Sequence, residues 1–84
     1  MPERTATLTF FASAAEAAGQ PSMDVPVHDG DTYRDVLLRS AEGNERLGRI
    51  VDGSAVFAGG ELVRDLDRPA DVDALDVLPP FAGG

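Results

Sequence analysis

The sequence contains no cysteine and no lysine, and its one histidine is His28. Without cysteine the chain cannot form a disulfide, a thiolate metal site or a thiol nucleophile. Without lysine it has no phosphate-binding glycine-lysine loop, and a single imidazole has no second ligand or nucleophile beside it. These absences argue against a self-contained enzyme, and we expect no catalytic residue, no bound metal and no bound cofactor.

Positive charge is also scarce, because seven basic residues, all arginine, stand against fifteen acidic ones and give a net charge of −8. Nucleic acids and anionic membranes both require a basic face, so neither is expected as a partner. No stretch approaches the roughly 18 to 20 apolar residues that span a bilayer, and the N-terminus lacks a signal peptide pattern. We therefore expect a cytoplasmic protein.

The acidic, lysine-free composition is typical of proteins from a salt-rich cytosol, where carboxylates keep the surface hydrated and salt screens their repulsion. A GC-rich genome could also replace lysine by arginine. The length of 84 residues allows one hydrophobic core, and 43% hydrophobic residues are enough to form it.

The first half of the chain predicts two strands and a helix. Residues 5–12 alternate between two faces, residues 13–19 suggest a helical turn or loop, and Met23, Val25 and Val27 alternate as a second strand, antiparallel to the first. Thr32 and Asp35 form a capping pair that starts a helix, and Gly43 is its expected stop. The helix is expected to be amphipathic, with apolar residues Tyr33, Val36, Leu37, Leu38 and Ala41.

The second half predicts further strands. Leu47, Ile50 and Val51 form a smaller apolar set, and residues 55–58 and 61–63 read as a hairpin around Gly59 and Gly60. An acidic loop follows, and residues 74–78 alternate as the last strand. A crossover through the helix places that last strand beside the first and parallel to it. We therefore predict an α+β β-grasp fold, with one main helix on one face of a mixed sheet of four to five strands.

Two features inside the predicted domain could be mistaken for sites. His28 precedes the turn residues Asp29 and Gly30, so we interpret it as a turn residue. The aspartates of the acidic segment do not follow the spacing of a calcium-binding loop, so we interpret them as a solvated face; they are Asp65, Asp67, Asp71, Asp73 and Asp76.

The C-terminal segment is the remaining candidate. We divide the chain into a domain, residues 1–78, and an extended, flexible C-terminal tail, residues 79–84, which can reach about 20 Å. Pro79 and Pro80 stiffen its start, and glycines at its end allow close approach to another backbone. A terminal Gly84 carboxylate could attack ATP and become an acyl electrophile. Alternatively, a Gly-Gly end is simply a frayed terminus.

Three segments carry a family resemblance: FFASAAEAAG near the start, GDT before the helix, and LPPFAGG at the end. They resemble, over essentially the whole chain, the small subunit of molybdopterin synthase and its relatives. These are ubiquitin-like sulfur carriers, including the thiamine-thiazole carrier, and they are similar to the archaeal small modifier proteins of salt-loving species.

The resemblance implies that a ubiquitin-activating-type enzyme uses ATP to adenylate Gly84. A sulfur donor then forms a thiocarboxylate, and sulfur passes to the large subunit of molybdopterin synthase or to another sulfur acceptor. In the modifier branch the same glycine forms an isopeptide bond with a lysine of a target protein. The tail that would enter the partner's active site consists of Phe81, Ala82, Gly83 and Gly84.

Docking of the activating enzyme is expected at the start of the tail, on Leu78, Pro79, Pro80 and Phe81. Because the chain has no lysine, it could modify other proteins but could not build side-chain-linked chains of itself. A different class of function stays open at this point, namely a non-covalent interaction module that uses the sheet and leaves the tail idle.

Overall fold

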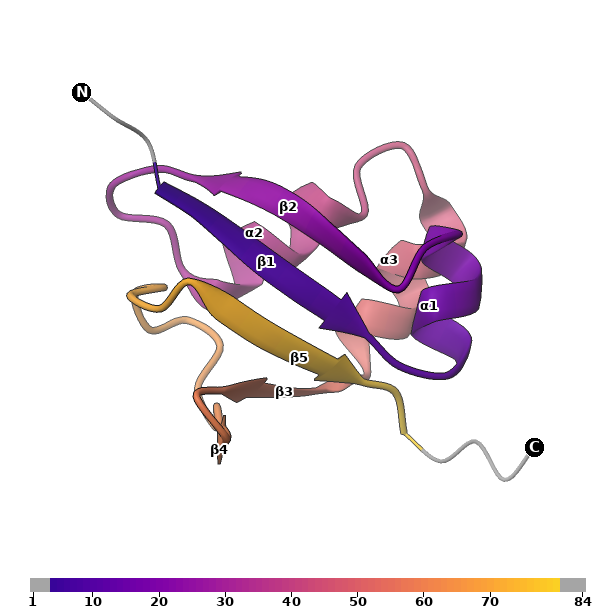
Figure 1. Ribbon diagram of the computed structural model, residues 1–84. Helices are drawn as coiled ribbons and strands as arrows, with labels where there is room; N and C mark the ends of the chain where they lie inside the picture. The colour runs from indigo at the N-terminus through magenta and orange to yellow at the C-terminus, as the bar shows by residue number, and fades with distance from the viewer. Residues whose placement is uncertain (1–3, 81–84) are drawn as a thin grey trace.

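A computed structural model of the chain describes residues 4–80, which form one mixed sheet with helices against it (Figure 1). The elements in chain order are β1 (Arg4–Phe10), α1 (Ser13–Ala18), β2 (Ser22–Val27), α2 (Tyr33–Ser40), α3 (Glu45–Asp52), β3 (Ala55–Ala58), β4 (Glu61–Leu62) and β5 (Ala74–Leu78). The five strands lie in the order β2-β1-β5-β3-β4. The predicted α+β fold is confirmed.

Strand β1 lies inside the sheet and makes both kinds of pairing. It is antiparallel to β2 and parallel to β5, with Leu8 opposite Leu75 and Phe10 opposite Val77. Side chains alternate across a strand, and on β1 every second residue, Ala6, Leu8 and Phe10, is buried under the helices. The predicted alternation of the first strand and its predicted parallel pairing with the last strand are both confirmed.

Helix α2 begins at the predicted capping box. The Asp35 N–H donates to Thr32 Oγ1 at 3.1 Å, and the Thr32 N–H donates to Asp35 Oδ2 at 3.0 Å, so two otherwise unpaired N–H groups are satisfied. The helix buries Tyr33, Val36, Leu37 and Ser40. It ends at Ser40, earlier than the expected stop at Gly43, which instead takes a positive φ of 76° in the following turn.

Helix α3 contains the apolar set to which the sequence analysis assigned no element. Asn44 caps its start by accepting the Leu47 N–H at 3.0 Å, and its side-chain amide donates to the Ala17 carbonyl of α1 at 2.9 Å. Leu47 and Val51 lie on one face and are buried. The fold therefore has two eight-residue helices against the sheet, besides the short α1.

Strands β3 and β4 form the predicted hairpin. Ala58 pairs with Glu61, and the two residues between them, Gly59 and Gly60, have φ values of 60° and 86°. Both positive angles match the tight turn that follows the twist of a two-stranded ribbon, and glycine adopts them without strain.

The acidic segment after β4 is fastened to the start of α2. The Tyr33 and Arg34 N–H groups donate to the carbonyls of Arg68 and Leu66 at 3.1 and 2.9 Å, and Arg34 also pairs with Asp67 at 2.9 Å. The carboxylates themselves lie at the surface, apart from a half-buried Asp76. No group of three metal-ligating side chains occurs within residues 4–80, and no helix there is long and apolar enough to cross a membrane.

Arg39 and Asp31 join α2 to the edge of the sheet. Arg39 Nη1 donates to Asp31 Oδ2 at 2.6 Å and to the carbonyl of Pro26 on β2 at 2.8 Å. Asp31 Oδ2 also accepts the N–H of His28 at 2.8 Å, which agrees with the interpretation of His28 as a turn residue. The hydrogen bond from Arg39, followed by that from His28, lowers the pKa of Asp31.

We predict that Asp31→Asn lowers the free energy of unfolding near neutral pH by about 1.5 to 3 kcal/mol, the usual contribution of a hydrogen bond to a charged group. The folded-state pKa lies below the unfolded one, so the stabilisation is present above about pH 4 and is lost as pH falls through the folded-state pKa. Urea titrations of both proteins from pH 7 downward measure this difference.

The matched control is Glu42→Gln, which removes an exposed carboxylate one helical turn after Arg39 and should change stability by less than about 0.5 kcal/mol. A wild-type-to-Asp31→Asn difference that stays constant from neutral to acid pH would contradict the assignment.

Candidate functional site

The last strand, β5, holds the start of the C-terminal tail in the centre of the sheet. It pairs with β1 on one side and with β3 on the other, and its inward residues Leu75 and Val77 are buried. Strands bonded on both edges and packed on one face are the most firmly held parts of a small domain. The chain therefore leaves from a rigid base, at Leu78, where the β5 arrow ends in Figure 1.

Two prolines end the sheet pairing at this exit. Pro79 is half-buried and Pro80 is exposed, and neither has an N–H to continue a ladder. The remaining tail residues, Phe81, Ala82, Gly83 and Gly84, lie outside the described residues. Their assigned roles, and the domain boundary before residue 79, stay predictions.

An exposed group of apolar side chains lies beside the exit, on the sheet face away from the helices. Ala55 pairs with Leu78, and Phe57 pairs with Leu62, so these two pairs share one face, since Val56 and Val77 point into the core. Leu62 and Leu78 are 42% and 36% exposed, Ala55 is exposed and Phe57 is half-buried. We call Ala55, Phe57, Leu62 and Leu78 the apolar strip.

The strip extends the docking surface that the sequence predicted. Of the four predicted residues, Leu78 belongs to the strip, Pro79 and Pro80 follow it directly, and Phe81 lies outside the described residues. Sequence reasoning missed Phe57 and Leu62. The signal was present, because an outward phenylalanine in an alternating edge hairpin is unusual for a solvated face. Only the strand register shows that both residues lie near the exit.

A tight corner follows β1 at the same end of the sheet. The Phe11 N–H donates to the carbonyl of Val77 at 3.2 Å, which continues the pairing of β1 with β5 up to the exit. Phe11 is 44% exposed. The next residue, Ala12, has φ 52° and ψ −126°, a conformation that strains any residue with a Cβ. The corner turns the chain from the sheet into α1 within two residues.

The perturbed titratable groups serve the fold. Burial raises the pKa of Tyr33. The hydrogen bond that its hydroxyl donates to Asp71, at 3.1 Å, raises this pKa further. Like Arg39 with Asp31, this pair joins two elements, here α2 and the acidic segment. Within residues 4–80, every buried side-chain nitrogen and oxygen has a hydrogen-bond partner. The described residues thus present an exposed apolar strip beside the point where the tail leaves the sheet.

A mixed five-stranded sheet with helices on one face, whose central last strand leads into the C-terminal tail, defines a ubiquitin-like β-grasp protein. No family model matches the sequence. The chain is 40% identical over 88 aligned positions to small archaeal modifier protein 3 of Haloferax volcanii, an alignment that covers 92% of this chain and 96% of that protein.

Solved structures agree with this relationship. Small archaeal modifier protein 1 of H. volcanii superposes with a TM-score of 0.79 at 26% identity, over 92% of this chain and 98% of that one. The putative molybdopterin converting factor, subunit 1, of Pyrococcus furiosus superposes with a TM-score of 0.76 at 21% identity, over 92% and 98% of the two chains, which shows the shared fold.

The chain belongs to the small archaeal modifier proteins. Its relatives in Haloferax are named as modifier proteins and not as enzymes. The acidic, lysine-free composition also fits a family with a member in Haloferax.

We predict that Ala12→Gly raises the free energy of unfolding by about 1 kcal/mol, because glycine adopts the corner conformation without strain. The relief of strain exceeds the larger conformational entropy that glycine loses on folding. Chemical denaturation measures the change. Ala17→Gly, inside α1, should lower stability by about 0.5 to 1 kcal/mol. Equal losses for both substitutions would show that the corner is not strained.

Proposed function

We propose that the carboxylate of Gly84 is the working group of this modifier, and that a ubiquitin-activating-type enzyme adenylates it with ATP. A carboxylate oxygen attacks the α-phosphorus of ATP, the bond to the pyrophosphate oxygen breaks, and pyrophosphate leaves. The product is an acyl-adenylate, in which the carbonyl carbon of Gly84 is an electrophile and AMP is a good leaving group.

Two transfers can follow from this one electrophile. In protein modification, the deprotonated amine of a target lysine attacks the carbonyl carbon, AMP leaves, and an isopeptide bond forms. In sulfur transfer, a hydrosulfide-level sulfur nucleophile attacks the carbonyl carbon, the bond to the AMP oxygen breaks, and AMP leaves. The product is a thiocarboxylate, whose sulfur passes to the large subunit of molybdopterin synthase or to another acceptor. We place protein modification first, because the relative at 40% identity is named as a modifier. Both transfers start from the acyl-adenylate, whose formation consumes ATP, so we place them in the cytoplasm.

The observation that supports this proposal most directly is the position of the exit. A strand held on both edges ends at Leu78, two prolines prevent further pairing, and an exposed apolar strip lies beside them. A partner that docks on the strip would hold a rigid body while it takes the tail into its own active site. Tail residues without large side chains suit a narrow channel that leads to a nucleotide.

The apolar strip is proposed as the docking surface for the activating enzyme. Its four residues come from three strands of one rigid sheet, and apolar groups that remain exposed on a small acidic protein commonly mark an interaction site. Leu62 is the best probe, because it lies on the two-residue edge strand β4 and is 42% exposed. Its substitution should leave the core intact.

We predict that deletion of Gly83 and Gly84 abolishes activation. The wild-type chain, incubated with its activating enzyme and ATP, should form the adenylate, and with a sulfur donor the thiocarboxylate, both detected by intact-mass analysis. The truncated chain should stay unmodified while keeping its unfolding midpoint, since the deleted residues lie beyond β5. In cells, conjugates to target lysines should disappear with the same deletion.

Absence of any mass change on the wild-type chain, under conditions in which a control carrier reacts, would overturn this proposal. An alternative role as a purely non-covalent module would be indicated if the truncated chain retained full activity in cells.

We also predict that Leu62→Asp lowers the kcat/KM of the activating enzyme for the chain at least tenfold, about 1.4 kcal/mol, because a charge would be buried in an apolar contact. The matched control is Leu38→Asp, which places the same charge on an exposed leucine of α2, on the helix side of the sheet. Pyrophosphate release gives the rates. Equal losses for the two variants would remove the strip from the docking surface.

A further inference from the structure

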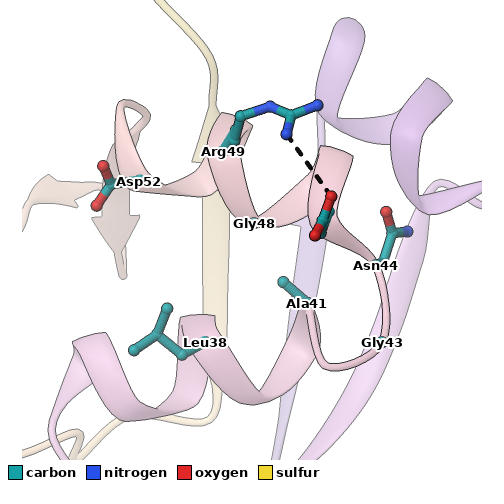
Figure 2. Close-up of a pocket in the computed structure, with 8 residues that line it drawn as sticks. Leu38, Ala41, Gly43, Asn44, Gly48, Arg49 and Asp52 are labelled. Atoms are coloured by element: carbon teal, nitrogen blue, oxygen red, sulfur yellow. Dashed lines mark ion pairs between the residues drawn. The ribbon is translucent and has the colours of Figure 1, made fainter.

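A groove between α2 and α3 is a second surface that the modifier activity leaves unused. It encloses about 600 Å3 and is open along its outer side (Figure 2). We call it the helix groove; its lining residues are Leu38, Ala41, Gly43, Asn44, Glu45, Gly48, Arg49 and Asp52. The helices cover the sheet face opposite to the apolar strip, so the groove and the strip lie on opposite sides of the domain.

Leu38 is the most exposed large apolar residue within the described chain. It is 54% exposed, whereas its neighbours Val36 and Leu37 are buried in the core. The core therefore does not depend on its side chain. A single exposed leucine is common on protein surfaces and would not by itself mark a site.

Gly48 supplies an independent observation. Glycine inside a helix costs about 1 kcal/mol relative to alanine, and α3 has only eight residues. A Cβ placed on Gly48 would lie 3.8 Å from Ala41 Cβ, an ordinary contact, and the residue does not have a positive φ. The fold therefore has room for alanine there. What glycine provides is open space in the groove opposite Ala41, and both residues line the groove in Figure 2.

The rim of the groove is acidic. Asp52 lines the groove at the end where Leu38 lies, and Glu42 lines an adjoining hollow that also includes Leu38 (Figure 2). Within residues 4–80 neither carboxylate has an ion-pair partner within 4 Å. By contrast, Arg34, Arg39 and Arg49 are paired with Asp67, Asp31 and Glu45. Leu38 and Ala41 thus lie next to two carboxylates without an ion-pair partner, which is complementary to a basic segment with an apolar face.

The backbone that surrounds the groove limits the shape of an occupant. Both walls are helices, so no sheet edge is available there to pair with an extended peptide. An occupant must satisfy its own backbone hydrogen bonds, as a helix does. The eight residues of α3 span about 12 Å, which matches roughly two turns of a bound helix.

We propose that the helix groove binds a short, basic, amphipathic helix of a partner protein, in a non-covalent contact that does not involve Gly84. Small or aliphatic side chains of the partner, spaced three or four residues apart, pack against Leu38 and Ala41 and over Gly48. Arginine or lysine residues on the flanks contact Glu42 and Asp52. Such a partner can recognise the modifier while the strip and tail are occupied by another protein.

The test is a titration of the full nitrogen-15-labelled chain with a synthetic helix-stapled peptide. The peptide carries leucines on one face and arginines on the flanks, and a matched version has glutamates in place of the arginines. The basic peptide should shift the amide signals of residues 38–52 and leave those of β3 and β4 unchanged. The acidic peptide should bind at least tenfold more weakly, because its glutamates would face the carboxylates of Glu42 and Asp52.

Gly48→Ala separates a binding role from a structural one. It should raise the unfolding midpoint by a few degrees, because alanine favours the helix. At the same time it should weaken the basic peptide about tenfold by filling the groove. Leu38→Ala should weaken binding similarly, and Leu62→Asp, on the opposite face, should leave it unchanged.

The proposal is overturned if millimolar basic peptide causes no shifts, if the shifts fall on the sheet face, or if Gly48→Ala binds the peptide as tightly as the wild type does. None of these outcomes bears on the activation of Gly84, so the two proposals can fail separately.

Discussion

The parallel pairing of β1 with β5 is the contact on which the rest of the structure depends. Parallel strands cannot be joined by a tight turn, so the intervening chain must cross over the sheet, and it does so with α2 and α3 on one face. The core forms between those helices and the inward residues of the paired strands, which include Leu8, Leu75 and Val77. The opposite face of the sheet is left uncovered. The same pairing places β5 in the centre, where the tail begins.

Local chemistry made much of this fold predictable. The capping box at Thr32 and Asp35, and the two glycines of the hairpin, each depend on residues close together in sequence. Helix α3 was harder to predict, because it has only eight residues, two of its apolar side chains carry its packing, and Gly48 lowers its intrinsic helix propensity. Its stability comes from tertiary contacts, such as the Asn44 bond to α1, which a local pattern does not contain.

The candidate site likewise has one part that could be predicted from the sequence and one part that could not. Leu78 and the two prolines follow from the last alternating strand, so their place at the exit could be predicted. The strip could not, because it depends on register between strands that are distant in sequence: Ala55 opposite Leu78, and Phe57 opposite Leu62. The helix groove likewise results from the packing of two helices. Each surface is assembled from at least two elements, the groove from the helices and the strip from the sheet face that the helices leave uncovered.

The hydrogen bond from Arg39 to Pro26 has a consequence for crowded solutions of this protein. Strand β2 is one border of the sheet, and an open border can recruit a strand from a neighbouring molecule. Repulsion between acidic chains opposes such pairing, but salt screens this repulsion, so it protects the border less at high salt concentration. In the second half of β2, Pro26 offers no N–H, and its carbonyl already accepts the Arg39 guanidinium. At this position the border can therefore neither donate nor readily accept a hydrogen bond from a neighbouring strand, and this protection does not depend on long-range charge.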